Sequence, residues 1–224
     1  MLCDQLSIMS PKSLINLVPR SLRDRHRETW YRSQTLFRPA LPVNADGKVY
    51  VHLGCGPLSF PGFINIDAIP LAHIHHVANV ERLPMLADAS ADLVYCSHCL
   101  EHISHLHVSE VLREWRRPLK SGGMLRLSVP DFDKILHIYA DNEHRMAPIE
   151  SVLLGGQDYA FNFHKSAYNK EHLIQLLTEA GFTNVKEWIP GSSELTTFGD
   201  WSGKTVRLCG KDYPISLNIE GQKP

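Results

Sequence analysis

The stretch VHLGCGPLSFPGFINID, residues 51–67, constrains the fold of this chain more than any other feature. Two apolar runs, Lys48–Leu53 and Gly62–Asp67, are typical of short buried strands. The segment between them, Gly54–Pro61, is shorter than the dozen or more residues that a crossover between parallel strands normally takes. We therefore expect two neighbouring strands joined by a loop or a single turn, with the first helix shortened or missing.

The rest of the chain alternates between strand and helix patterns. Further strands are expected at Ala91–Ser97, Met124–Asp131, 183–189 and 215–222, and helices at 107–120, 132–142 and 169–182. The glycines of SGG, residues 121–123, are expected to end the first of these helices. Such alternation predicts an α/β fold in which helices cover both faces of the sheet. Residues 189–213 are expected to form a loop or hairpin inserted between the last two strands.

Chemistry-bearing residues follow several of the expected strands. The two glycines of GCG, Asp67, the stretch Ser97–His102 and Pro130–Asp131 all stand at strand ends. In an open α/β sheet, ligands bind outside the carboxyl ends of the strands, at the point where the strand order reverses. These residues are therefore expected to converge on one crevice.

Composition and charge exclude several classes of protein. The 224 residues carry a formal net charge of -1, which gives no reason to expect nucleic acid as a partner. No apolar run approaches the roughly 20 residues that span a bilayer, and an acidic start broken by Pro11 argues against a signal peptide. Five cysteines without a framework spacing are typical of reduced thiols, hence of a cytoplasmic protein.

The N-terminal segment differs from the rest in charge. Residues 1–40 hold seven Lys and Arg against three Asp and Glu. We expect residues 1–44 to form a helical, basic extension, with helical segments between 11 and 38, and residues 45–224 to form the main domain. The basic segment is a solvated helix or, alternatively, a contact for a substrate, a partner or the cofactor site.

The glycine turn itself favours a nucleoside ligand. Ser59 stands where the dinucleotide fingerprint G-x-G-x-x-G needs its third glycine, and no phosphate-binding Lys-Ser/Thr pair follows the loop. Asp67 at the tip of the second strand can accept hydrogen bonds from both ribose hydroxyls of a nucleoside. A plain tight turn and a surface acid remain the alternatives for these residues.

Taken together, the motifs resemble a known family. VHLGCGP, GFINID, ADLVYCSHCLEHI and the segment that ends in LRLSVPD are similar to the class I S-adenosylmethionine-dependent methyltransferases, in particular to the small bacterial type 11 branch. The resemblance is dense over residues 48–135 and looser towards the last strand. It implies a Rossmann-like, doubly wound sheet of seven mostly parallel strands with an antiparallel last strand.

The resemblance also implies roles for individual residues. Gly54, Cys55 and Gly56 would line the methionine part of S-adenosyl-L-methionine, and Asp67 would bind the ribose. The remaining cofactor contacts would come from residues beside the adenine or near the sulfonium: Ala68, Asn79, Val80, Ser97 and His98. The family's usual acid two residues before the first glycine is His52 here, so that contact with the cofactor either differs or is weaker.

Histidines are the candidates for a catalytic base. An alcohol or protonated amine must lose a proton near neutral pH, the range in which histidine titrates. His98 and His102 follow the expected strand that ends at Ser97, and His164 lies where the family builds its acceptor wall. Cys96-x-x-Cys99 lacks a second pair, and His98 and His102 have no clear third ligand at metal spacing. We therefore expect no metal site.

The sequence thus predicts a cytoplasmic biosynthetic methyltransferase that uses S-adenosyl-L-methionine. Its acceptor is expected to be a hydroxyl or amine of a small molecule or sugar-containing metabolite, and a homodimer is left open. One alternative is a catalytically inactive, cofactor-binding subunit of the same fold. Another is a nucleotide-linked oxidoreductase, which Ser59 and the lack of a Tyr-x-x-x-Lys motif disfavour.

Overall fold

The computed structural model describes residues 38–196, 199–208 and 210–224. The helical segments expected between residues 11 and 37, and most of the basic extension, lie outside these ranges. The expected boundary between extension and domain therefore stays a prediction. Within the described ranges, every helix is too short or too polar to cross a membrane.

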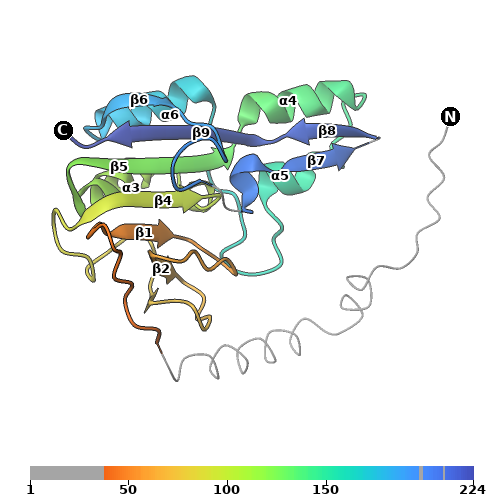
Figure 1. Ribbon diagram of the computed structural model, residues 1–224. Helices are drawn as coiled ribbons and strands as arrows, with labels where there is room; N and C mark the ends of the chain where they lie inside the picture. Colours follow the sequence, from red (N-terminus) through yellow and green to blue (C-terminus); the bar gives the residue numbers. More distant parts are fainter. Residues whose placement is uncertain (1–37, 197–198, 209) are drawn as a thin grey trace.

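A seven-stranded sheet forms the centre of the molecule (Figure 1), with the strand order β3-β2-β1-β4-β5-β9-β6. The strands are β1 Tyr50–Leu53, β2 Phe63–Asp67, β3 His76–Val77, β4 Ala91–Ser97, β5 Leu119–Pro130, β6 Thr183–Glu187 and β9 Ser216–Gln222. β1 pairs in parallel with β2 and β4, whereas β9 runs antiparallel to both β5 and β6. The predicted mostly parallel sheet with an antiparallel last strand is confirmed.

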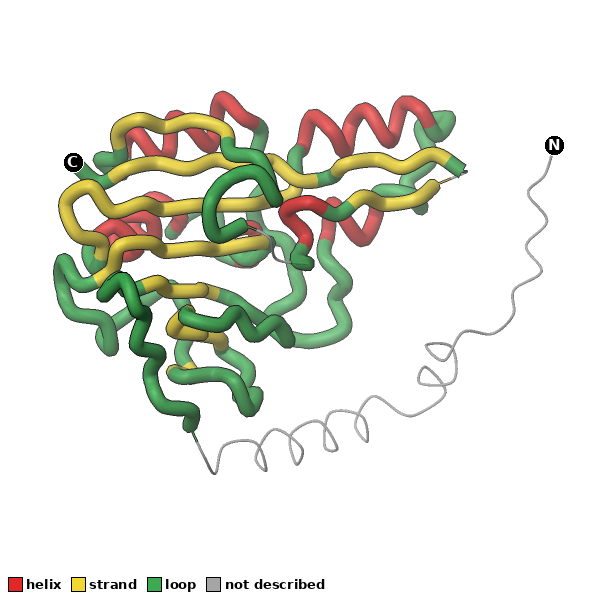
Figure 2. Tube along the Cα trace, in the orientation of Figure 1, coloured by secondary structure: helices red, strands yellow, loops and turns green. Residues whose placement is uncertain are grey.

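The first crossover contains no helix. β1 pairs directly with β2, and residues 54–62 between them form only turns and extended segments (Figure 2). The chain can still connect two parallel strands because the loop folds back over the sheet, where Phe60 is buried. The predicted loss of the first helix is confirmed.

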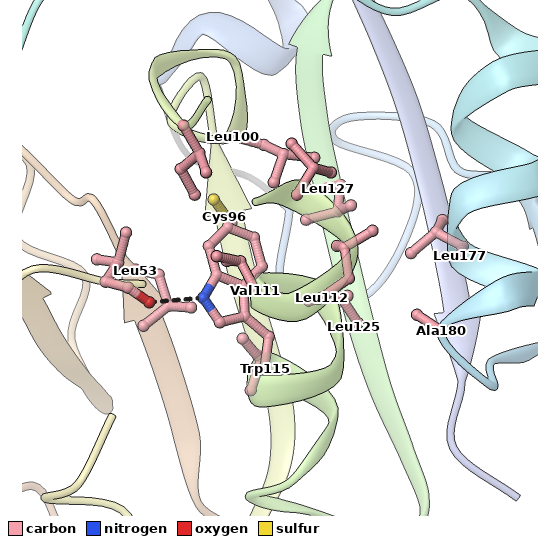
Figure 3. Packing of buried hydrophobic residues seen from close by; sticks show 14 of the residues in the cluster. Leu53, Cys96, Leu100, Val111, Leu112, Trp115, Leu125, Leu127, Leu177 and Ala180 are labelled. Carbon is pink, nitrogen blue, oxygen red and sulfur yellow. Dashed lines mark hydrogen bonds between the residues drawn. The ribbon is translucent and has the colours of Figure 1, made fainter. Parts of the chain in front are cut away.

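Two helices cover one face of the sheet. They are α3, Val108–Arg116, and α6, Lys170–Glu179, and both lie behind the strands in Figure 1. The buried positions of α3 recur at helical spacing, as the sequence predicted: Val108, Val111, Leu112 and Trp115. They pack with the inward-facing side chains of β1, β4 and β5 into the largest hydrophobic cluster (Figure 3).

On the other face of the sheet, a cluster beside β1 and β4 is covered by loops. Its side chains, among them Phe63 and Tyr95, pack against Phe60 and Trp188, and these two come from segments that are not helical. In the described ranges no helix contributes to this cluster. The short first crossover leaves no residues for a helix between β1 and β2.

The C-terminal edge of the sheet carries additional structure. The helical turn η1, Leu100–His102, follows β4, and the helices α4, Phe132–Asp141, and α5, Glu150–Leu154, follow β5 (Figure 1). The turn η2, Trp201–Gly203, and the hairpin of β7, Thr205–Leu208, and β8, Lys211–Pro214, come before β9 in the chain. The hairpin β7–β8 confirms the predicted insertion. Tyr213 of the hairpin packs with Ile135 and Ile138 of α4.

The end of α3 differs from the sequence prediction. The helix stops at Arg116, and the glycines at 122 and 123 lie inside β5 rather than at a helix end. Pro118 follows the C-cap residue Arg117, and proline has no backbone N–H with which to continue the helical hydrogen bonds.

Candidate functional site

The glycine loop turns sharply at the end of β1. Gly54 and Gly56 have φ of +61° and +53°, a left-handed region that side chains with a Cβ rarely adopt. The Gly54 N–H donates to the Ile66 carbonyl at 2.9 Å, which holds the loop against β2. A Cβ at Gly54 would lie 2.4 Å from the Cys99 Sγ, whereas one at Gly56 would meet no described atom within 4 Å. The backbone at Gly56 therefore faces open space.

Asp67 lies at the end of β2 and joins that strand to the loop. Its Oδ2 accepts a hydrogen bond from the Gly56 N–H at 2.8 Å, and its Oδ1 accepts one from the Ile69 N–H at 2.8 Å. The residue is 8% exposed. Each carboxylate oxygen has a second lone pair, so the side chain can still accept hydroxyl protons from a ligand. This is the pairing of glycine loop and acid that a bound nucleoside requires.

Sequence reasoning missed His73 as a member of this site. Its Nε2 lies 3.0 Å from the Gly56 carbonyl and 4.0 Å from the Cys55 Sγ. A carbonyl oxygen only accepts, so this nitrogen carries the proton and donates. Burial raises the pKa of Cys55 well above its usual range, so this thiol stays protonated. No local pattern singles out His73 among the histidines of residues 73–76; the fold brings it to the loop.

The residues expected beside the adenine lie near β2 and β3. Ala68 follows Asp67 directly and is partly exposed. Asn79 is exposed, and its Oδ1 accepts from the Glu81 N–H at 3.0 Å. Val80 is buried, and its carbonyl accepts from the Trp115 indole at 2.8 Å. Their roles at the cofactor stay predictions.

His52 has an environment that the sequence did not indicate. Its ring stacks on Phe60 at a centroid distance of 4.3 Å and is 1% exposed. Burial lowers the pKa of His52 to about 3, so the ring is neutral at physiological pH. Its Nδ1 has no hydrogen-bond partner among the described residues. The ring can therefore offer a neutral hydrogen bond at most, not the ion pair that the usual acid would form.

The end of β4 presents Ser97 and His98 at the same edge of the sheet. His98 has φ of +51°, which is uncommon for a residue with a Cβ and marks a constrained turn. The Ser216 hydroxyl donates to the Trp201 carbonyl at 2.7 Å, so it accepts from His98 Nε2 at 2.8 Å. Trp201, which is 47% exposed, lies with its ring centroid 6.1 Å from that of His98.

The three histidines predicted as catalytic candidates surround one acid. Glu101 is 1% exposed, and its Oε1 lies 3.4 Å from His98 Nδ1 and 3.9 Å from His164 Nε2. The rings of His102 and His164 have centroids 4.9 Å apart. The structure thus brings His98, His102 and His164 together, which the sequence could only suggest for the first two.

Burial and charge act in opposite directions on this group. Burial alone would raise the pKa of Glu101, but His98, His102 and His164 lower it below its usual value. The pKa of His164 is lowered by burial, although the charge of Glu101 opposes that shift. The Glu101 carboxylate therefore keeps its charge near neutral pH.

One cavity among the described residues lies elsewhere. It measures about 340 Å³ and is lined by residues such as Lys48, Asp92 and Gly122, at the amino-terminal edge of the parallel strands. Ligands of open α/β sheets bind at the opposite, carboxyl edge. We therefore assign the functional site to the glycine loop, Asp67 and the histidine cluster, not to this cavity.

Parts of the chain are similar in sequence to known methyltransferases. Residues 65–127, from the second half of β2 to β5, match the family described as "Methyltransferase domain". Proteins of two Mycobacterium tuberculosis strains, each described as a probable S-adenosylmethionine-dependent methyltransferase, are 26% identical to this chain over 199 residues. The alignment covers 80% of this chain and 65% of those relatives, so the chain spans slightly less than two thirds of their length.

Solved structures share the fold at lower identity. One is a possible histamine N-methyltransferase of Thermotoga maritima, with 18% identity, a TM-score of 0.52, and coverage of 92% of this chain and 97% of that one. Another is the 1,6-didemethyltoxoflavin-N1-methyltransferase of Burkholderia thailandensis, solved with 1,6-didemethyltoxoflavin and S-adenosylhomocysteine. It has 15% identity, a TM-score of 0.52, and coverage of 98% and 93%. In motifs and sequence the chain is thus similar to S-adenosylmethionine-dependent methyltransferases, and it shares their fold of seven mostly parallel strands.

Proposed function

We propose that this protein transfers the methyl group of S-adenosyl-L-methionine to a hydroxyl or amine of a small molecule or sugar-containing metabolite. The observation that carries the proposal is Asp67, whose carboxylate is hydrogen-bonded to Gly56 while the backbone of that glycine faces open space. The bound cofactor supplies an electrophilic methyl group on a sulfonium. The protein's own residues bind, orient and, where needed, deprotonate the acceptor.

The fit of the cofactor rests on the loop and the acid together. Asp67 retains lone pairs for two ribose hydroxyls, and Gly54, Cys55 and Gly56 would contact the methionine part. His73 holds the Gly56 carbonyl at 3.0 Å, which fixes the loop before a ligand arrives. Such preorganisation reduces the entropy that binding costs.

The acceptor side is assigned to the end of β4 and the segments facing it. His98, His102 and His164 lie around Glu101, and the exposed ring of Trp201 lies beside His98. We propose that these histidines position the acceptor and hold or remove its proton. Trp201 would form an apolar wall for a planar or sugar ring.

The compartment and the partners are also part of the proposal. The described cysteines Cys55, Cys96 and Cys99 are free thiols, as in proteins of the reducing cytoplasm. A cytoplasmic enzyme of biosynthesis with a small-molecule acceptor fits this chemistry, and a homodimer is compatible with it.

Substitution of Asp67 tests the cofactor role. Asp67→Ala should weaken S-adenosylhomocysteine binding at least about tenfold, which corresponds to roughly 1.4 kcal/mol and to the loss of one charge-assisted hydrogen bond. Asp88→Ala, which removes an exposed acid paired with Arg117, is the control and should bind as the wild type does. Isothermal titration calorimetry measures all three proteins. Equal affinity of Asp67→Ala and wild type would refute the assignment.

Turnover separates an enzyme from an inactive subunit of the same fold. In an acceptor screen that detects release of S-adenosylhomocysteine, His98→Ala and His164→Ala should lower turnover and leave cofactor affinity nearly unchanged. An absence of release with every acceptor, despite normal cofactor binding, would favour the inactive subunit. NAD binding without S-adenosylmethionine binding would contradict the proposal outright.

A further inference from the structure

Glu101, His102 and His164 form a set of side chains that has the composition of a metal site. One ligand atom from each lies within 4.8 Å of those of the other two. Glu101 and His102 belong to η1, directly after β4, and His164 comes from the loop between α5 and α6. We propose that these three residues bind one divalent transition-metal ion, with Zn²⁺ as the first candidate.

The carboxylate of Glu101 is buried, and neither of its oxygens has a hydrogen-bonded cation among the described residues. The residue is 1% exposed, and neither Oε1 nor Oε2 has a hydrogen-bond partner of good geometry among the described residues. The nearest nitrogen, His98 Nδ1, is 3.4 Å from Oε1, at the outer limit of hydrogen bonding. Burying a carboxylate with so few partners costs free energy, and a coordinated cation would offset that cost.

The histidines are oriented as metal ligands usually are. His102 Nδ1 lies 3.1 Å from the Phe163 carbonyl, and because a carbonyl only accepts, this nitrogen carries the proton. The lone pair of His102 is therefore on Nε2. The His164 Nε2 is the ring atom that faces Glu101, at 3.9 Å from its Oε1. Outer hydrogen bonds of this kind fix the tautomer and the direction of ligating imidazoles.

The two segments that supply the ligands are tied together by their backbones. The N–H groups of Lys165 and Ser166 donate to the Glu101 carbonyl at 2.7 Å and 3.2 Å. The Ser166 hydroxyl donates to the Ile103 carbonyl at 2.7 Å. The loop that carries His164 is thereby held against η1, so bringing the three ligands into coordination distance needs only side-chain adjustment.

The ligand set selects the kind of ion. Two imidazoles and one carboxylate suit Zn²⁺ and neighbouring divalent ions, whereas Mg²⁺ and Ca²⁺ prefer oxygen ligands. Three protein ligands leave a fourth position open, which is the arrangement of catalytic rather than structural zinc sites. From the sequence we expect no metal, because His98 and His102 lack a clear third ligand at metal spacing. The fold supplies that ligand from His164.

The location connects the ion to the acceptor. Cys99, two residues before Glu101, packs against Gly54 of the cofactor loop. An ion beside this loop could take the acceptor oxygen or nitrogen at its open position and make that group easier to deprotonate. With the ion bound, His102 and His164 are ligands, and His98 is the histidine left to act on the proton. This last step rests on the proposed function, whereas metal binding itself does not.

Metal binding by the full-length chain tests the inference. Metal-free protein is titrated with Zn²⁺ by calorimetry and with Co²⁺ by visible absorption, which reports the ligand geometry of the ion. We expect one high-affinity equivalent of either ion and much weaker binding of Mg²⁺. Glu101→Gln and His102→Ala/His164→Ala should each weaken Zn²⁺ binding more than about tenfold.

The matched control removes two exposed histidines instead. His107→Ala/His137→Ala deletes side chains that are 58% and 65% exposed, and it should retain the high-affinity equivalent. Thermal melts and S-adenosylhomocysteine titrations show whether each variant is folded. Glu101→Gln keeps the shape of the side chain and needs no counter-charge, so we expect it to fold.

Two results would overturn the inference. Absence of a high-affinity equivalent in the wild type would mean that these three side chains do not form a metal site. Equal binding by wild type, ligand variants and control would mean that scattered histidines bind the ion. A protein that binds Zn²⁺ in this way but not S-adenosylhomocysteine would instead refute the proposed function and leave the metal site standing.

Discussion

At the scale of single residues, His52 shows how the environment changes a side chain's chemistry. The ring lies against Phe60 and within 5.3 Å, centroid to centroid, of Tyr95. Burial lowers the pKa of His52 to about 3, far below the value of 6.5 that an exposed histidine has. Folding therefore requires the neutral ring, and the unfolded chain binds a proton that the folded chain does not.

This difference predicts a specific acid sensitivity. As pH falls below 6.5 towards 3, protonation of His52 in the unfolded state lowers the free energy of unfolding by about 1.4 kcal/mol per pH unit. His52→Phe keeps a ring on Phe60 and removes this titration. Between pH 7 and pH 5, the wild type should lose about 2 kcal/mol more than the variant, measured by urea unfolding. If the free energy of unfolding fell equally with pH in the wild type and in His52→Phe, His52 would not be buried in this way.

At the scale of elements, the site depends on how closely the glycine loop packs on the turn after β4. Gly54 combines a φ of +61° with direct contact to Cys99. Gly47 has a φ of +69°, but a Cβ added there would meet no described atom within 4 Å. Comparing substitutions at the two glycines therefore separates the effect of backbone strain from the effect of close packing. The sheet itself is secured elsewhere, through α3 and the hydrogen bond from Trp115 to Val80.

Alanine at these two glycines should have different effects. Gly47→Ala should cost about 1 kcal/mol of stability through backbone strain alone. Gly54→Ala should cost clearly more and also weaken S-adenosylhomocysteine binding, because the loop must move away from Cys99. Cys99→Gly combined with Gly54→Ala should recover part of both losses. Urea unfolding and calorimetry measure the effects, and similar values for both single variants would contradict the close packing.

At the scale of the whole molecule, one hydrophobic cluster joins nearly the entire sheet. It contains Val51 and Leu53 of β1, Leu127 of β5 and Ile219 of β9, together with side chains of α3 and α6. The glycine loop proposed to bind the cofactor follows β1, and Asp67 ends β2 of the same sheet. A ligand held by the loop and Asp67 therefore stabilises the molecule as a unit.

The free energy of unfolding should rise with ligand concentration as expected for a ligand that binds only the folded protein. S-adenosylhomocysteine at 100 times its Kd should raise the free energy of unfolding by about 2.7 kcal/mol. With Asp67→Ala, a tenfold weaker affinity at the same concentration reduces that gain to about 1.4 kcal/mol. Unfolding is followed by tryptophan fluorescence, to which the buried Trp115 and Trp188 contribute, and by far-UV circular dichroism. The transitions seen by the two signals should shift together when the ligand is added. Separate transitions for the two signals would show that the sheet and its covering segments unfold independently.

Local patterns predicted most of the elements. Ala91–Ser97 forms the strand that its apolar, β-branched composition indicated, and the spacing of Val108, Leu112 and Trp115 predicted the buried face of α3. The expected helix end at SGG was wrong because Pro118 stops the helix earlier. The short helix α5, Glu150–Leu154, was missed because it buries no side chain and so carries no periodic signal.

The alternation of strands and helices, the loss of the first helix and the glycine loop followed by Asp67 could all be predicted from the residues alone. They follow from residue spacing and chain length, which act over a few neighbouring positions. The three-dimensional packing was needed to reveal that His52 lies in an aromatic cluster, that His73 holds Gly56, and that His164 faces Glu101 and His102. Such contacts join residues far apart in the chain, and they depend on how whole segments pack against the sheet.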